Sequence, residues 1–305
     1  MRGWWQDLTD LVLPGECGGC GVPRTVLCAR CRAVLSGAAV HRVRPVPEPP
    51  GLPEVHAAAR YADEVRATLL AHKERGALAL AGPLGVALAG AVRAGVRSAS
   101  ARAGLVCSRG GRAHVLLVPV PSGRRSVRAR GHDPARRIAL AAAGELRRRG
   151  FPARVVGVLR QRRAVADQSG LNSRQRLDNL AGALAVAPAG ARLLCAGPVV
   201  LVDDVMTTGA SLAEAARAVR AASSAPGVPS GASGPIPNAA WTSAVYGGET
   251  WESREEQNVG SRQERTGRPP ARQVNAGAGD AGGVVDVVCA AVVAASPDSF
   301  EINRN

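Results

Sequence analysis

Aromatic residues and lysine are nearly absent from this chain. Aromatic side chains make up 3% of the 305 residues and hydrophobic residues 46%, so a core has to be built from Ala, Val and Leu. Lys73 is the only lysine, although Lys and Arg together number 39 and the net charge is +15. Such an excess attracts polyanions, either nucleic acid or phosphorylated metabolites. Part of this positive charge reflects the composition of the whole chain, in which Arg, Ala and Gly are all abundant.

Long apolar runs are missing as well. No stretch reaches the roughly 18 uninterrupted apolar residues that a membrane helix needs. Asp7 and Asp10 interrupt the apolar residues near the N-terminus, unlike the core of a signal peptide. We therefore expect a cytoplasmic protein without membrane contact, in which thiols stay reduced.

Changes of composition divide the chain into five segments. Residues 1–43 form a cysteine-bearing module, and the proline-rich residues 44–54 are typical of a linker. Residues 55–222 and 284–297 carry the patterns of a folded domain. Between them, Gly, Pro and Ser make up 24 of the 61 residues of 223–283, which lack Leu, Phe, Met and Cys. Such a segment cannot bury enough apolar surface to offset its ordering entropy, so it is predicted to be a disordered insertion.

The two folded segments alternate between strand and helix patterns. Short apolar runs predict strands at Val55–Tyr61, His114–Val120, Val155–Leu159, Val199–Val202 and Val284–Val293. Helical periodicity and capping residues predict helices at Glu64–His72, Leu84–Ala101, Asp133 to about Arg149, and Ser211–Ala222. This alternation indicates an α/β fold with a mostly parallel sheet and helices on both faces.

The strongest functional pattern is the stretch from Val199 to Ser211. An apolar strand ends in Asp203 and Asp204, and a turn rich in hydroxyls and glycine then opens a helix. At the carboxyl edge of a parallel sheet, the first turn of a helix presents free N–H groups and a positive dipole end, which bind anions. The residues of this turn are Val205, Met206, Thr207, Thr208, Gly209, Ala210 and Ser211.

The paired carboxylates narrow the choice of anion. They would repel a phosphate unless they face vicinal hydroxyls or a metal, so Asp203 and Asp204 suit the hydroxyls of a ribose, with Mg²⁺ bridging sugar and pyrophosphate. A Walker B strand also ends in acids, but its partner motif GxxxxGK[ST] is absent around Lys73, the only lysine. A chance apolar-acidic-turn pattern is the remaining alternative.

This stretch resembles the signature of the type I phosphoribosyltransferases, and the chain is similar to their competence protein F (ComF) branch. The similarity runs from the cysteine module to Val293, without the insertion. Two further segments agree in order. The pyrophosphate loop and R-G-x-N-Q segment are matched by Val118–Pro121, Arg124, Arg128, Arg130 and Gly131, and the Q…L…R…N segment by Gln168, Leu171, Arg176 and Asn179. Asp133-Pro134 departs from the family, which commonly has Asn-Gln there.

The resemblance implies an α/β protein that binds 5-phosphoribosyl 1-pyrophosphate with Mg²⁺. Two activities fit it. The protein transfers the phosphoribosyl group to an acceptor, or it senses a nucleotide-like ligand without turnover while single-stranded DNA, helicase or recombination proteins bind elsewhere during DNA uptake. No residue is assigned as catalytic. The expected ligand-binding residues are Lys73, Pro121, Ser122, Arg128, Arg130, Asp203, Asp204, Met206, Thr207, Thr208, Gly209, Ala210 and Ser211.

Basic residues outside the turn allow two interpretations. A loop and first helical turn carry six arginines with only Asp133 opposing them, so the loop either folds over a pyrophosphate or is a solvated surface. Lys73 either places a point charge near a phosphate or is present by chance in a chain that otherwise has Arg in place of Lys. The six arginines are Arg124, Arg125, Arg128, Arg130, Arg136 and Arg137.

The N-terminal cysteines have the spacing of a metal centre. Cys17-x2-Cys20 and Cys28-x2-Cys31 are separated by seven residues, and four sulfurs at this spacing suit a closed, structural Zn²⁺ site. Metal binding would supply folding energy to a segment too small for a core of its own. An iron–sulfur cluster, a redox-active pair and a disulfide are the alternatives. The isolated Cys195 and Cys289 are predicted to be buried thiols.

Overall fold

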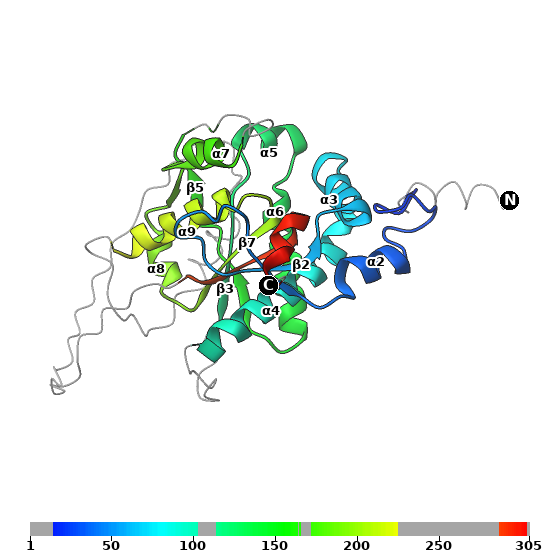
Figure 1. The fold of residues 1–305 in the computed structure, drawn as a ribbon, viewed down its shortest axis with the longest axis horizontal. Coiled ribbons are helices and arrows are strands. Elements are labelled where there is room, and N and C mark those ends of the chain that lie inside the picture. Colours follow the sequence, from blue (N-terminus) through cyan, green and yellow to red (C-terminus); the bar gives the residue numbers. More distant parts are fainter. Residues whose placement is uncertain (1–14, 103–113, 164, 166–171, 225–286, 304–305) are drawn as a thin grey trace, which may run out of the picture.

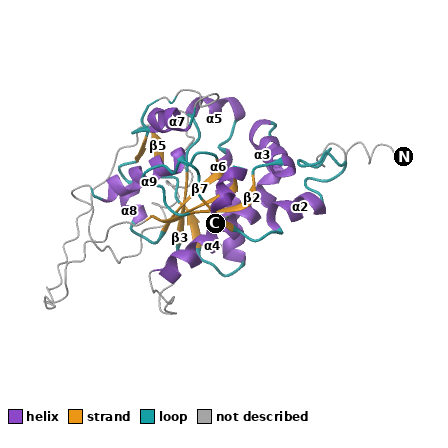
Figure 2. Ribbon diagram, viewed as in Figure 1, coloured by secondary structure: helices purple, strands orange, loops and turns teal. Residues whose placement is uncertain are grey.

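The computed structural model describes residues 15–102, 114–163, 165, 172–224 and 287–303. Nearly all of the predicted insertion lies outside these residues, as do Cys107, Gln168 and Leu171. The described residues form an α/β fold in which helices cover a central sheet (Figures 1 and 2).

Six strands form the central sheet in the order β1-β2-β8-β7-β3-β4. Every pairing is parallel except that of β1 with β2. The middle strands are rich in buried Val, Leu and Ala, as expected for a parallel sheet covered on both faces. Strand β7 continues beyond the predicted Val199–Val202, so Asp203 and Asp204 lie within its C-terminal half. The bounds are β1 (His41–Val43), β2 (Val55–Arg60), β3 (Val115–Pro119), β4 (Ala153–Val155), β7 (Val199–Met206) and β8 (Val287–Ala295). The predicted α/β fold is confirmed.

The helices lie in two layers that enclose two clusters of buried apolar side chains. One cluster packs α2 (Ala29–Ser36), α3 (Asp63–Glu74), α4 (Ala81–Arg102) and α6 (Pro134–Arg148) against the sheet. The other packs α9 (Ala210–Ser223) and α8 (Gly190–Leu194) against the opposite face. The small side chains let α4 and α6 approach closely, since a Cβ on Gly85 would lie 2.5 Å from the Cβ of Ala141.

Helix α4 is the most apolar element. Together with the 3-10 turn η1 (Leu78–Leu80) it is long and apolar enough to cross a membrane, by length and composition only. Half of its most apolar window is buried inside the protein, where it packs on β2, β8 and α6. This is the packing of a core helix.

A second, two-stranded antiparallel sheet joins β5 (Leu159–Gln161) to β6 (Leu184–Val186). Helices α5 (Arg124–Arg130) and α7 (Ser173–Leu180) lie at the same end of the molecule (Figure 1). The predicted strand Val155–Leu159 is therefore wrong, because β4 ends at Val155 and Leu159 begins a strand of the other sheet. Both flanks of this short run are apolar, and periodicity alone does not show where such a run bends.

The segments before Val55 are packed onto the domain. Buried Cys17, Leu27 and Leu35 belong to the same apolar cluster as α3 and α4. Strand β1 lies within residues 1–43 of the predicted cysteine module, yet it forms an edge of the central sheet. Residues 44–54 connect β1 to its neighbour β2. The Arg44 N–H donates a hydrogen bond to the carbonyl oxygen of Ser299, which lies in the C-terminal 3-10 helix η2 (Pro297–Asn303).

Candidate anion-binding site and four-cysteine centre

The turn between β7 and α9 is shaped by Gly209. Its φ of 74° lies in the left-handed region, and a Cβ there would lie 3.0 Å from Leu52 Cδ2. Glycine satisfies both constraints because it has no Cβ. Gly209 is also the N-cap of α9, with no side-chain cap hydrogen bond, so the N–H groups of the first turn are available to an anion. The exposed Thr207 and half-buried Thr208 and Ser211 flank the turn, while Met206 and Ala210 are buried.

The loop after β3 lies beside this turn. Strand β3 pairs in parallel with β7, with Pro119 opposite Val202, so Pro121 and Ser122 leave the sheet at the same edge. Asp133 holds this loop. One carboxylate oxygen accepts the Ser122 N–H at 3.3 Å, and the other caps α6 through the Arg136 N–H at 3.2 Å. The predicted N-cap is thus confirmed, and the residue that departs from the family pattern connects the loop to α6.

Lys73 and Asp204 form an ion pair across 131 positions of the sequence. The ammonium Nζ donates to Asp204 Oδ2 at 3.0 Å, and the side chains are 33% and 8% exposed. Asp204 Oδ1 also accepts the Val205 N–H at 2.8 Å. The structure thus places the Lys73 ammonium beside the second aspartate of the predicted ligand-binding stretch, and its contact with a phosphate stays a prediction.

The two aspartates differ in their electrostatics. Loss of water around Asp203, followed by the negative charge of Asp204, raises the pKa of Asp203 well above its usual value. Burial alone would lower the pKa of Lys73, but attraction to Asp204 and Asp203 outweighs it and the pKa is raised. Lys73 therefore keeps its positive charge at neutral pH, whereas Asp203 holds its proton more tightly than an ordinary aspartate.

Two arginines bring unpaired N–H groups to the site. Arg130 Nε donates to Glu74 Oε2 at 3.1 Å, whereas its buried Nη1 has no partner among the described residues. Arg176 on α7 donates from Nη1 to Thr207 Oγ1 at 3.4 Å, and its buried Nε likewise has no partner there. The set of ligand-binding residues expected from the sequence omitted Arg176, although the resemblance had already pointed to it. Arg128, on α5 like Arg130, is exposed.

The four cysteines Cys17, Cys20, Cys28 and Cys31 converge on one point. Their sulfurs all lie within 4.8 Å of one another, and none forms a disulfide. Burial alone would raise the pKa of Cys17, but N–H groups of Cys20, Cys28 and Gly19 outweigh it and lower the pKa to about 6. Burial raises the pKa of Cys31. Four sulfurs at this spacing, with N–H groups directed at them, fit a thiolate-bound metal ion.

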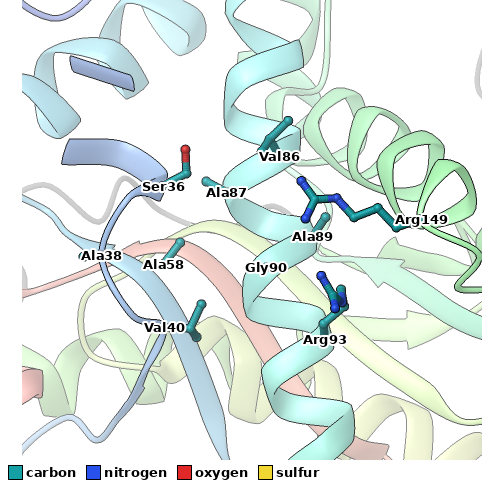
Figure 3. Close-up of a pocket in the computed structure, with 10 residues that line it drawn as sticks. All are labelled: Ser36, Ala38, Val40, Ala58, Val86, Ala87, Ala89, Gly90, Arg93 and Arg149. Carbon is teal, nitrogen blue, oxygen red and sulfur yellow. The ribbon is translucent and has the colours of Figure 1, made fainter. Parts of the chain in front are cut away.

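A hollow of about 100 Å³ lies beside α4, and its lining includes Ser36 at the end of α2, Ala58 of β2 and Arg149 just after α6 (Figure 3). Arg93 and Arg149 border it, and Gly90 lies on its α4 side. It is smaller than the roughly 300–1,000 Å³ of ordinary ligand pockets and shares no residue with the turn. We assign no ligand to it.

Comparison with protein-family models and with curated proteins finds no match to this chain. The features that the structure establishes are the mostly parallel α/β sheet and the N-terminal four-cysteine cluster.

Proposed function

We propose that this chain is a ComF-like protein of the phosphoribosyltransferase type that binds 5-phosphoribosyl 1-pyrophosphate, or a related phosphoribosyl ligand, with Mg²⁺. The supporting observation is the uncapped turn at Gly209, which follows two aspartates at the carboxyl edge of a parallel sheet. Open helix N–H groups suit a phosphate, and acids immediately before them suit sugar hydroxyls.

In this proposal each element has one role. The N–H groups and hydroxyls of residues 207–211 hold the ribose phosphate. Asp203 and Asp204 accept the ribose hydroxyls, and Asp204 can do so while paired with Lys73 because a carboxylate has about four acceptor positions. The unpartnered N–H of Arg130 suits the pyrophosphate. Mg²⁺ would arrive with the pyrophosphate and neutralise part of its charge.

For an enzyme, the reaction is transfer of the phosphoribosyl group through an oxocarbenium-like state, as at other anomeric centres. Arg130 stabilises the pyrophosphate as its bond to the ribose C1 breaks, and the acceptor supplies the atom that forms the new bond to C1.

A non-enzymatic ligand sensor is the second candidate, and Asp133 favours it. Both of its oxygens are used within the protein, where the family commonly has an amide pair. Such a sensor would act in the cytoplasm during DNA uptake, with single-stranded DNA or helicase and recombination proteins as partners.

Zinc is the metal that we propose for the four cysteines, in a structural role. A closed thiolate set without an open coordination position is typical of structural zinc sites. Metal analysis of purified protein should find about one zinc per chain, lost when Cys17 and Cys28 are replaced by Ser. An iron–sulfur cluster would instead give a coloured, iron-containing protein, and a folded protein without metal would exclude both.

Calorimetric titration tests the phosphoribosyl ligand. With Mg²⁺ present, phosphoribosyl pyrophosphate should bind the unmodified protein, and Asp203→Asn with Asp204→Asn should weaken binding at least about tenfold, the scale of one lost charged hydrogen bond. Asp298→Asn, an exposed acid on η2, is the matched control. Equal affinity in all three proteins would refute the assignment. Pyrophosphate release with candidate acceptors separates the enzyme from the sensor.

A further inference from the structure

Two buried histidines lie against each other behind the proposed anion site. His72 is in the last turn of α3, directly before Lys73, and His132 follows α5 by two residues. Their ring centres are 5.4 Å apart and tilted by 60°. His72 is 0% exposed and His132 is 8% exposed. The contact therefore joins the end of α3 to the turn that follows α5 and its last residue, Arg130.

The hydrogen bonds of the rings determine which nitrogens carry hydrogen. His72 Nδ1 lies 3.4 Å from the carbonyl oxygen of Ala77, and His132 Nδ1 lies 3.2 Å from that of Arg130. A carbonyl oxygen only accepts, so each Nδ1 has to be the protonated donor. In a neutral ring, Nε2 then carries a lone pair and no hydrogen. Both Nε2 atoms are buried and have no partner among the described residues.

A single added proton changes this arrangement. With three hydrogens on the four ring nitrogens, both bonds to carbonyl oxygens are kept and one of the two bare Nε2 atoms becomes an N–H donor. A second proton would place two cations in contact inside the protein. The two rings should therefore titrate as a unit that takes up one proton.

The surroundings decide when that proton binds. Asp204 of β7 and Arg137 of α6 act on His72. Lys73 and Glu74 follow His72 in the chain, and Arg130 and Asp133 flank His132. The Lys73–Asp204 and Arg130–Glu74 ion pairs cancel four of these charges, which leaves Asp133 and Arg137. Burial, with His132 and Arg137, lowers the pKa of His72 and outweighs the Ala77 carbonyl and Asp204. Burial therefore favours the neutral form of His72, and an anion placed beside Lys73 and Arg130 would oppose this effect.

The same surroundings disfavour a metal ion between the rings. Lys73, Arg130 and Arg137 are cationic, and among the described residues no third His, Cys, Asp or Glu joins the two histidines in a metal-binding group. A proton, unlike a metal ion, needs only one of the two Nε2 lone pairs.

We propose that the His72–His132 pair is a proton-accepting element of the adjacent anion site and takes up one proton when a multiply charged anion binds there. This inference rests on the proposed function for the location of the anion, but not for its identity. Because linkage is reciprocal, proton uptake on binding means that affinity rises as pH falls. Uptake of one full proton changes the affinity by about tenfold per pH unit.

Sulfate is the probe, because its charge does not change near neutral pH. Its affinity should increase from about pH 7.5 to 5.5, around the ordinary histidine pKa. Calorimetry in buffers of different ionisation enthalpy should give close to one proton bound per sulfate. His132→Asn keeps a donor for the Arg130 carbonyl and removes one ring of the pair, so its sulfate affinity should depend clearly less on pH than that of the unmodified protein. His41→Asn, an exposed histidine on β1, is the control and should behave as the unmodified protein.

Several results would overturn the proposal. These are a pH-independent sulfate affinity, no sulfate binding at any pH, and an unchanged pH dependence in His132→Asn. If that variant does not fold, His72→Asn provides the same comparison. Zinc bound by a variant without the four cysteines but not by its His132→Asn derivative would show that the rings hold a metal instead. Proton-linked sulfate binding without phosphoribosyl pyrophosphate binding would refute the proposed function alone.

Discussion

Replacing Lys73 by Met should destabilise the protein more than any conservative change of its partner Asp204. At 3.0 Å the two charges attract by about 5–6 kcal/mol at an effective dielectric of about 20, opposed by the desolvation that both groups have undergone. Lys73→Met leaves the Asp204 carboxylate, 8% exposed, without a counter-ion. Breaking a buried pair in this way costs about 3–5 kcal/mol. Protonation of the unpaired Asp204 carboxylate relieves part of this cost, so we expect the variant to lose about 3 kcal/mol of unfolding free energy at pH 7.5.

Asp204→Asn should cost less, about 1 kcal/mol, the scale of one ordinary hydrogen bond. Asn still accepts the Val205 N–H, and Lys73 is 33% exposed and can turn its ammonium to water. The double variant should lie close to Asp204→Asn, because the unpaired carboxylate is then gone. This asymmetry comes from the difference in burial between the two partners.

Urea unfolding of the four proteins measures these free energies. In Lys73→Met the unpaired carboxylate has a raised pKa in the folded state, so the folded protein binds more protons than the unfolded chain and the deficit should shrink from pH 7.5 to 5.5. Arg75→Met, an exposed neighbour at the end of α3, should change stability by less than about 0.5 kcal/mol. A Lys73→Met deficit no larger than that of Asp204→Asn, or one independent of pH, would refute the reasoning.

Three further predictions follow from backbone geometry and burial. Gly209→Ala should cost at least about 1–2 kcal/mol in urea unfolding, because the left-handed φ penalises a Cβ that would also press on Leu52; a neutral effect would contradict the turn geometry. Burial lowers the pKa of His56 and His114 in the folded state, so their contribution to stability is present above about pH 6.5 and decreases as pH falls below it; unfolding curves at pH 7.5 and 5.5 check the sign. Cys289 is fully buried with a pKa raised to about 12, so iodoacetamide should modify it only after unfolding; rapid labelling in the native protein would show that the strand opens.

The sequence predicts features whose causes are local. Asp133-Pro134 is recognisable as a helix start because the capping bond spans only three residues. Buried strands are recognisable from short runs of Val and Leu, and the Gly209 turn from glycine and hydroxyl residues before a helix. Each of these signals lies within a few residues of the structure that it predicts.

The missed features depend on contacts between distant residues. Lys73 meets Asp204 only because the parallel sheet brings β7 beside the end of α3, and no pattern around Lys73 encodes that distance. His72 and His132 are 60 positions apart, and no sequence pattern around either one indicates that their rings meet. Residues 44–54 have the composition of a linker, yet Leu52 contacts the turn at Gly209, and this depends on the pairing of β1 with β2.

The end of α3 explains why these distant contacts act together. His72, Lys73 and Glu74 are consecutive, and they reach His132, Asp204 and Arg130 respectively. Successive residues of a helix point about 100° apart, so one helical turn can contact both β7, through Asp204, and the segment that carries Arg130 and His132. A ligand that binds Arg130 or Asp204 therefore competes with contacts made by this one helical turn. In the proposal above, the proton-accepting His72 and the anion-binding Lys73 are neighbours on that turn, so an anion that changes the charge around Lys73 also changes the charge around His72.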